Sequence, residues 1–213
     1  MERLPRNFYA RDTLTVAKDL LGCVMAREYQ GELLLGRITE TEAYIGRCDK
    51  ACHAYQYKRT KRTETLFSPP GTAYLYLIYG MYTCLNFVTE AEGEPAAVLI
   101  RAMEPLEGAE TMARLRFGRP LDQLTAYQRK NFLNGPGKVC KAIDLDRSLD
   151  GHDLLAPPLY VLPRQGPVGE IQCGPRIGVD YAQEAKDFPW RFWVGVKAFA
   201  FTPFSCAGRH SSA

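Results

Sequence analysis

A chain of 213 residues, 46% hydrophobic and 24% charged, has a globular composition and can bury a substantial core, which excludes a disordered or fibrous protein. Its net charge of +3 permits a local basic surface but does not by itself indicate nucleic acid. No apolar run reaches the roughly 18 residues of a membrane span, and the start MERLPRNFYA does not have the pattern of a signal peptide. Seven cysteines without a C-x-x-C pair are expected to be reduced thiols, so we predict a soluble intracellular protein, in a bacterial cytoplasm or nucleoid or a eukaryotic nucleus.

The first half of the chain is predicted to form one helix and two β-hairpins. The predicted elements are a helix from Thr13 to Gly22, strands over 23–29 and 32–44, a loop over 46–70, and a hairpin over 72–88. Asp12 or Thr13 can cap the helix, and Gln30-Gly31 can form the first turn. The second hairpin turns near Tyr79-Gly80-Met81, where Gly80 can take the positive φ that a tight turn needs.

The second half is predicted to be helical first and then to return to short strands. Its predicted elements are a strand over 96–103, helices over 107–115, 121–132 and 138–141, strands over 159–163, around Ile177 and over 191–198, and a loose tail from Pro203. No repeat or linker divides the chain. We therefore expect one compact α+β domain over residues 1–213, with an antiparallel sheet, a protruding β-hairpin and flanking helices.

The segment RITETEAYIGRCDKACH, residues 37–53, concentrates chemistry on a predicted strand. A strand's period of two predicts one face formed by Ile38, Glu40, Glu42 and Tyr44. Because desolvating a carboxylate costs several kcal/mol, an acid is rarely buried without a partner. If this face is the inner one, at least one of the two acids is there to react.

Cys48, Cys52 and His53 form a C-x3-C-H pattern, which could bind a metal ion. A structural zinc site normally has four ligands, and no fourth ligand lies at a familiar spacing. We therefore expect no metal and no cofactor, and His53 remains free for another role.

Several blocks of the sequence resemble the alkyladenine (3-methyladenine) DNA glycosylases. These blocks are ETEAY, the short segment that ends at His53, PGTAYLYLIYGMYTCLN, LIRAMEPLEG, GPGKVCKA and PRIGV. The similarity extends from about Thr13 to Val196. The resemblance implies a single compact domain that removes alkylated purines by base flipping. The implied partner is double-stranded DNA with damaged purines, and we expect a monomer.

Breaking an N-glycosidic bond requires a leaving base, an oxocarbenium-like sugar and a nucleophile on the far side of the sugar. A carboxylate beside the sugar can accept a proton from water and stabilise the developing positive charge. The resemblance places this acid at Glu42 and a water-holding arginine at Arg101, which would also keep Glu42 ionised. The alternative is a buried ion pair without a chemical role. Glu40 is expected to be structural.

The resemblance also assigns the pocket for the flipped base. Aromatic faces suit a flat and often cationic ring, because stacking contributes about 1–3 kcal/mol per base. The implied base-binding residues are Tyr44, His53 and Tyr76 around the base, Asn86 on the floor, and Leu99 and Ile177 in the walls. Asn86 is expected to disfavour the 2-amino group of guanine, and Ile177 is larger than the valine expected there. Without the resemblance, the tyrosines could simply be strand residues.

Flipping leaves a gap in the duplex, which an exposed wedge at a hairpin tip can fill. The resemblance places the intercalating residue at Tyr79, with Met81 beside it; the alternative is a tyrosine packed on its own hairpin. Arg59 and Arg62 in the basic loop, and Lys138 after the glycine turn of GPGK, are expected to contact DNA phosphates.

We therefore predict a monofunctional DNA glycosylase, because no lysine stands where Glu42 acts, which argues against a lyase that forms a Schiff base. One alternative is a non-catalytic DNA-lesion binding protein, which would not need the acid. Another is a glycosidase of free nucleosides or sugars that uses Glu40 and Glu42 as a pair. That second alternative leaves the apolar hairpin tip and the basic loop unexplained.

Overall fold

The computed structural model describes residues 2–195, so the predicted strand end at 196–198 and the tail from Pro203 lie outside the described residues. The helices are α1 (Arg6–Tyr9), α2 (Thr13–Asp19), α3 (Ala109–Phe117), α4 (Ala126–Lys130) and α5 (Pro136–Ala142), with 3-10 turns η1 (Tyr55–Tyr57), η2 (Glu64–Phe67), η3 (Leu121–Gln123), η4 (Arg147–Leu149) and η5 (Asp180–Asp187). The strands are β1 (Val24–Tyr29), β2 (Glu32–Ile45), β3 (Ala73–Ile78), β4 (Tyr82–Val88), β5 (Ala96–Glu107), β6 (Leu159–Leu162), β7 (Ile171–Gly174) and β8 (Arg191–Val194).

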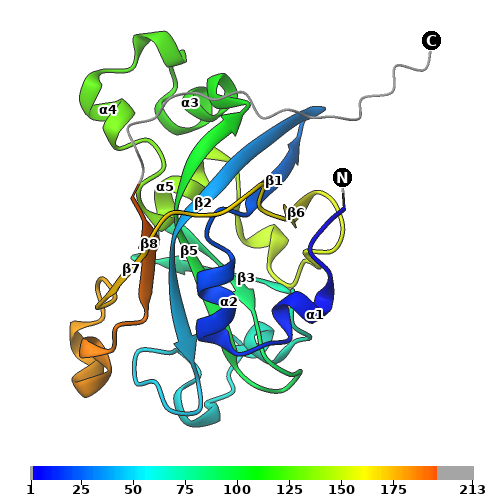
Figure 1. Ribbon diagram of the computed structural model, residues 1–213, viewed down its shortest axis with the longest axis vertical. Helices are drawn as coiled ribbons and strands as arrows, with labels where there is room; N and C mark the ends of the chain where they lie inside the picture. The colour runs from blue at the N-terminus through cyan, green and yellow to red at the C-terminus, as the bar shows by residue number, and fades with distance from the viewer. Residues whose placement is uncertain (1, 196–213) are drawn as a thin grey trace.

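These strands form one open antiparallel sheet of eight strands, with the main order β3-β4-β5-β2-β1-β6 (Figure 1). The central strand β2 pairs with β5 along one edge, and along the other edge with β1 and then β8. β7 pairs only with β8 among the strands described. The antiparallel sheet and the surrounding helices confirm the predicted α+β class.

The turns predicted from glycine positions are present. Gln30 and Gly31 have φ of 48° and 82°, and Tyr79 and Gly80 have φ of 52° and 68°, so both hairpins turn through left-handed residues. The Asp12 side chain caps α2 by accepting the backbone N–H of Thr15 at 2.9 Å. Local turn and capping chemistry therefore decided these boundaries.

Two predicted elements are wrong. The strand expected around Ile177 ends earlier, at Gly174 in β7, and Ile177 lies in a bend. The helix expected over 121–132 is split into η3 and α4, because Leu124 is extended and Thr125 begins a new helix with a capping box to Gln128. In both cases a local signal for ending an element outweighed the apolar pattern.

The two faces of the sheet bury different kinds of residue. The main core joins α2, α3 and α5 to the sheet, and it takes Leu75, Phe87 and Val98 from β3, β4 and β5. Neighbouring residues in the same strands, such as Tyr74 and Ala97, point to the opposite face and form a second cluster beneath the loop over 46–70. The functional site develops on this second face.

An irregularity in the β2–β5 pairing changes which face Ile38 occupies. The register shifts on both sides of Glu40, so that Ile38 joins the main core together with Ala43. The prediction that Ile38 shares a face with Glu42 and Tyr44 is therefore wrong. The bulge turns the two acids away from the main core while the strand before them stays within it.

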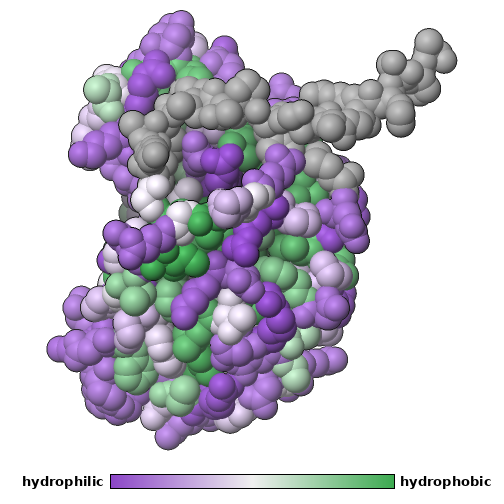
Figure 2. All heavy atoms as spheres, in the orientation of Figure 1, coloured by the Kyte–Doolittle hydropathy of each residue, from purple (hydrophilic) through white to green (hydrophobic). Residues whose placement is uncertain are grey.

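The face seen in Figure 2 carries polar side chains over most of its area, with apolar patches near the middle. None of the helices within residues 2–195 combines the length and the apolar character that a membrane-spanning segment needs.

Candidate active site

Glu42 lies at the centre of the site, three residues before the C-terminal end of β2, with no exposed surface. Its Oε1 accepts the backbone N–H of Ile177 at 2.8 Å and lies 3.4 Å from Nη1 of Arg101. Its Oε2 accepts the hydroxyl of Tyr44 at 2.8 Å. Two directed hydrogen bonds and one cation therefore fix both oxygens of a buried carboxylate.

Burial raises the pKa of the Glu42 carboxyl above its ordinary value. The Arg101 charge, the Ile177 N–H and the Tyr44 hydroxyl act in the opposite direction, and the nearby charge of Glu40 adds to the rise. Arg101 thus stabilises the carboxylate as predicted, but desolvation outweighs it. The result is a carboxylate that binds a proton more readily than an exposed one.

Glu40, the second acid of this face, is held by two arginines. Arg101 Nε donates to its Oε1 at 3.0 Å, and Arg191 Nη1 of β8 donates to the same oxygen at 3.2 Å. Arg101 therefore bridges the two acids, which is more than the simple Glu42–Arg101 pair considered from the sequence. The contacts of Glu40 fit the structural role expected for it.

A cavity of about 360 Å³ opens beside Glu42, within the size range of small-molecule pockets. The predicted site residues that line it are Tyr44, His53, Tyr76, Tyr79, Asn86, Leu99, Arg101 and Ile177. Glu42 does not line the cavity itself, but its three contacts, Tyr44, Arg101 and Ile177, all do. The acid therefore lies directly behind the cavity wall.

Aromatic rings gather on one side of this cavity. His53 and Tyr76 meet edge to face with ring centroids 4.6 Å apart, and Tyr74 and Tyr76 are tilted with centroids 5.4 Å apart. Alternation along β3 places Tyr74 and Tyr76 together, and the loop over 46–70 brings His53 over them. Tyr44 comes from β2 and completes the aromatic lining.

The contacts of His53 define its tautomer. Nε2 lies 3.3 Å from Nη2 of Arg62, and Nδ1 lies 3.1 Å from the hydroxyl of Tyr74. A guanidinium can only donate, so Nε2 is the acceptor and Nδ1 carries the proton. Burial, with a smaller effect from Arg62, lowers the pKa of His53 to about 4, so the ring is neutral at pH 7.

Asn86 and Leu99 form the inner end of the cavity. They face each other across β4 and β5, and both are buried. The amide Nδ2 of Asn86 donates to the carbonyl of Tyr74 at 3.2 Å, which fixes the orientation of the amide. Ile177 forms part of the rim, with 52% of its surface exposed.

The tip of the β3–β4 hairpin projects apolar side chains into solvent. Tyr79 is 79% exposed and Met81 is 71% exposed, although both are large hydrophobic residues. Tyr79 also borders the cavity, whereas Met81 does not. The tyrosine is therefore not packed back on its own hairpin, which was the alternative from the sequence.

The predicted basic residues differ in how available they are. Arg59 is ion-paired with Glu64 at 2.6 Å, and Lys138 donates to Asn131 and Asn134 at 3.2 and 2.8 Å. Arg62 lies beside the cavity, 5.5 Å from the centroid of the Tyr76 ring.

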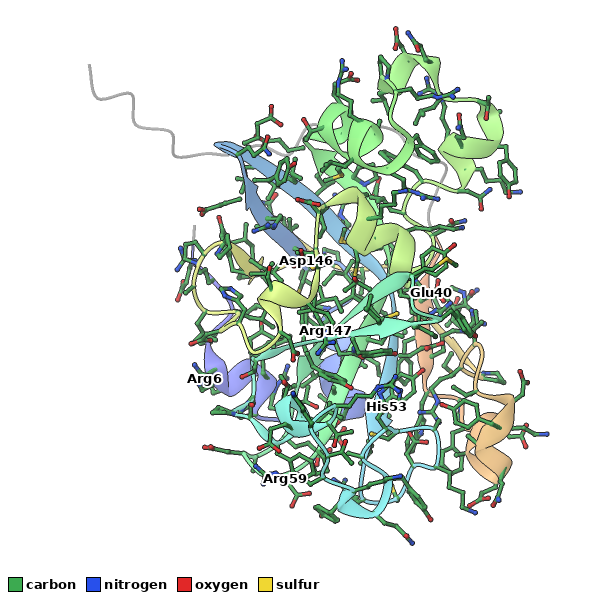
Figure 3. The ribbon with its side chains drawn as sticks, turned by 180° about the vertical axis from the view of Figure 1, so that it is seen from behind. Arg6, Glu40, His53, Arg59, Asp146 and Arg147 are labelled. Atoms are coloured by element: carbon green, nitrogen blue, oxygen red, sulfur yellow. The ribbon has the colours of Figure 1, made fainter. Side chains whose placement is uncertain are left out.

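A second hollow continues from Arg62 along the outside of β3. Its lining includes Lys61, Arg62 and Arg147 together with Leu75 and Leu77. Arg147 belongs to η4, far from the basic loop in sequence, and is labelled in Figure 3. No sequence pattern indicated that this third cation lies here.

Comparison with known proteins identifies the family. The model of the methylpurine-DNA glycosylases matches residues 7–198. The chain belongs to this family. Its relatives include three proteins that are each 50% identical to it. They come from Clostridium perfringens strain SM101 (over 200 residues), Desulfitobacterium hafniense strain Y51 (over 194 residues) and Alkaliphilus oremlandii (over 197 residues). These matches cover 92%, 91% and 92% of this chain and 98%, 96% and 98% of the relatives, all of which carry the name "Putative 3-methyladenine DNA glycosylase".

The described part of this glycosylase has no group of three or more His, Cys, Asp or Glu side chains that could hold a metal ion. Cys48 is exposed and Cys52 is buried, and both ring nitrogens of His53 have other partners. The C-x3-C-H pattern therefore does not assemble into a ligand set.

Sequence reasoning missed several parts of the glycosylase site. Tyr74 and Tyr181 also line the cavity, and the Ile177 backbone N–H rather than its side chain contacts Glu42. Arg176 and Asp49, fully buried beneath this region, were not predicted either. Arg176 lies within the PRIGV block, but only long-range packing shows what it touches.

Proposed function

We propose that this protein flips alkylated or deaminated purines out of double-stranded DNA and hydrolyses their N-glycosidic bond, leaving an abasic site. As a member of the methylpurine-DNA glycosylase family it is a DNA repair glycosylase, and the names of its relatives support 3-methyladenine as a substrate. One observation carries the proposed mechanism: a fully buried, hydrogen-bonded Glu42 directly behind an aromatic cavity large enough for a base.

In the proposed reaction, ionised Glu42 takes a proton from water as the water oxygen bonds to C1′. The C1′–N9 bond breaks, and its electron pair leaves with the purine. The carboxylate also stabilises the positive charge on the sugar. The raised pKa of Glu42 supports this role, because a stronger base takes the proton more readily near neutral pH. Arg101 and the Ile177 N–H hold the Glu42 carboxylate in a fixed orientation.

Tyr44, Tyr76 and His53 are proposed to hold the flipped base by stacking. Alkylation at ring nitrogen gives many lesions a positive charge, and a cation over an aromatic face is favoured by about 0.5–2 kcal/mol. The neutral state of His53 supports this assignment, since a protonated imidazole would repel such a base. Asn86 is proposed to disfavour the 2-amino group of normal guanine. Leu99 and Ile177 are proposed to form walls of the pocket, where the size of Ile177 limits the fit of bulky lesions.

Tyr79 is proposed to fill the gap that the flipped nucleotide leaves, with Met81 beside it at the tip. Their exposure supports this, because neighbouring large apolar side chains in water mark a surface that another molecule, such as a base stack, can cover. Arg62, Lys138 and Arg59 are proposed to contact phosphates on the same side of the molecule. We further propose that the protein acts as a monomer and inside the cell, where the damaged DNA is.

Neither alternative function has comparable support. The three relatives named above are all called putative glycosylases, and their names do not indicate lesion binding without catalysis. A glycosidase with paired acids would need Glu40 free to react, and Glu40 is engaged by Arg101 and Arg191.

The direct test is base release from duplexes that carry one defined lesion each: 3-methyladenine, 7-methylguanine, hypoxanthine or ethenoadenine. Strand cleavage by alkali after incubation reports the abasic site, and chromatography identifies the free base. An undamaged duplex is the matched control. If no lesion is released above that control, the proposed reaction is wrong.

A further inference from the structure

Asp49 and Arg176 form a bidentate ion pair with no exposed side-chain surface on either partner. Arg176 Nη2 donates to Asp49 Oδ1 at 2.8 Å, and Nη1 donates to Oδ2. A buried ion pair adds little net stability, because desolvating both charges offsets their attraction. Its placement under the active site therefore calls for a reason other than stability.

The pair joins three segments that form the walls of the cavity. Arg176 donates to the carbonyl of Ala43 in β2 at 2.8 Å and to the carbonyl of Ala185 in η5 at 3.0 Å. Asp49 Oδ1 also accepts the backbone N–H of Ala51 at 2.9 Å, in the loop that leads to His53. Ala43 lies between Glu42 and Tyr44, so this contact reaches the backbone of the proposed base.

Both hydrogen bonds on Glu42 come from groups that Arg176 holds. The next residue, Ile177, donates its N–H to Oε1, and Tyr44 donates its hydroxyl to Oε2, each at 2.8 Å. The Arg176 guanidinium lies 4.7 Å from the centroid of the Tyr44 ring. Arg176 is buried and does not line the cavity, so it covers the face of that ring turned away from the base site.

Resting on the proposed function, we infer that Asp49 and Arg176 are positioning residues for base release, which hold the Ile177 N–H and the Tyr44 hydroxyl on the Glu42 carboxylate. Neither residue touches the base or the sugar. They act by keeping the carboxylate oriented, and a small misplacement of a reacting group can cost about 100-fold in rate.

The main variant is Asp49→Asn, which keeps the shape and removes the charge that holds Arg176. Glu104→Gln is the matched control, because it breaks the Arg37–Glu104 ion pair between β2 and β5, and neither residue lines the cavity. Single-turnover excision and lesion-DNA affinity are measured across pH on protein that circular dichroism shows to be folded.

We expect Asp49→Asn to slow excision about 10- to 100-fold, while lesion affinity stays within about threefold. The acidic limb of the rate profile should also move to higher pH, because the Ile177 N–H is one of the groups that lower the pKa of Glu42. The charged and titratable groups around Glu42 are Glu40, Tyr44, Tyr76, Cys84, Arg101 and Arg176, together with Arg191, its cross-strand neighbour in β8. Apart from the loosened Arg176, the substitution leaves these groups in place. Glu104→Gln should leave the limb unchanged.

Ile177→Pro provides a second route if Asp49→Asn does not fold. The substitution removes the N–H donor and leaves the Asp49 and Arg176 side chains unchanged, although proline also fixes φ at this exposed rim position and restricts the backbone of the preceding Arg176. Loss of the donor should reproduce the shift of the acidic limb. An unshifted limb in either folded variant overturns the inference. The inference is also overturned if a variant loses excision rate and lesion affinity together, both in proportion to the fraction of protein that is folded. Wild-type protein that releases no base would instead refute the proposed function.

Discussion

Replacing Glu42 by Gln tests the proposed chemistry with little change in shape. The amide oxygen can accept the Ile177 N–H in place of Oε1, and the amide nitrogen can donate to the Tyr44 hydroxyl, which can accept as well as donate. Both hydrogen bonds at 2.8 Å can therefore persist. What disappears is the ability to take a proton and the negative charge beside the sugar.

The expected loss follows from these two functions. A positioned general base contributes about 10²–10⁴ in rate, or about 3–5 kcal/mol of barrier. Arg101 keeps its hydrogen bond to Glu40 at 3.0 Å, so the substitution does not leave an unpaired buried cation. We expect excision to fall at least 100-fold, near the lower limit for such a base. Thermal stability should not fall, because the costly buried carboxylate is removed.

Single-turnover base release and gel-shift affinity on the same lesion duplex separate catalysis from binding. Lesion binding should survive, because the stacking residues Tyr44, Tyr76 and His53 are unchanged. Glu40→Gln is a useful companion, since its loss should disturb Arg101 and Arg191 without removing the base. Excision by Glu42→Gln within a few-fold of wild type, in folded protein, would refute the assignment of Glu42 as the base.

Four further predictions follow from the site. Tyr79→Ala should weaken lesion binding by about 1–3 kcal/mol in duplex DNA but much less in single strands, whereas Tyr76→Ala should weaken both; equal losses for Tyr79→Ala would contradict its role as a wedge. Arg62→Gln should lower the slope of log affinity against log salt by about 0.9, and Arg59→Gln should lower it less because Glu64 already pairs with it; equal slopes in all variants would place the DNA surface elsewhere. The pKa of His53 is lowered from 6.5 to about 4, so between these pH values the unfolded chain binds a proton that the folded protein does not. The free energy of unfolding, measured with urea, should therefore fall as the pH drops through this window. The variant His53→Gln should show a smaller fall. Excision should persist after exhaustive chelation, and elemental analysis should find no stoichiometric zinc; loss of activity that zinc restores would contradict this.

The sequence alone determined much of the scaffold, because the signals are local. The cap at Asp12, the turn at Gln30-Gly31 and the turn at Tyr79-Gly80 depend on residues adjacent in the chain. Period-two alternation likewise put Tyr74 and Tyr76 on one face of β3. The same locality explains the differences at 121–132 and at Ile177, where the chain ends an element at a local signal and does not continue it.

The tertiary structure decided the electrostatics of the site. The register shift at Glu40 arises from the pairing of β2 with β5, and no pattern within β2 reveals it. Arg191 meets Glu40 across 151 residues, and Arg176 meets Asp49 across 127 residues. Such contacts have no sequence period, because they depend on how distant strands and loops pack. The sequence therefore determined which side chains could do the chemistry, and packing alone determined which of them are buried, charged and aimed at Glu42.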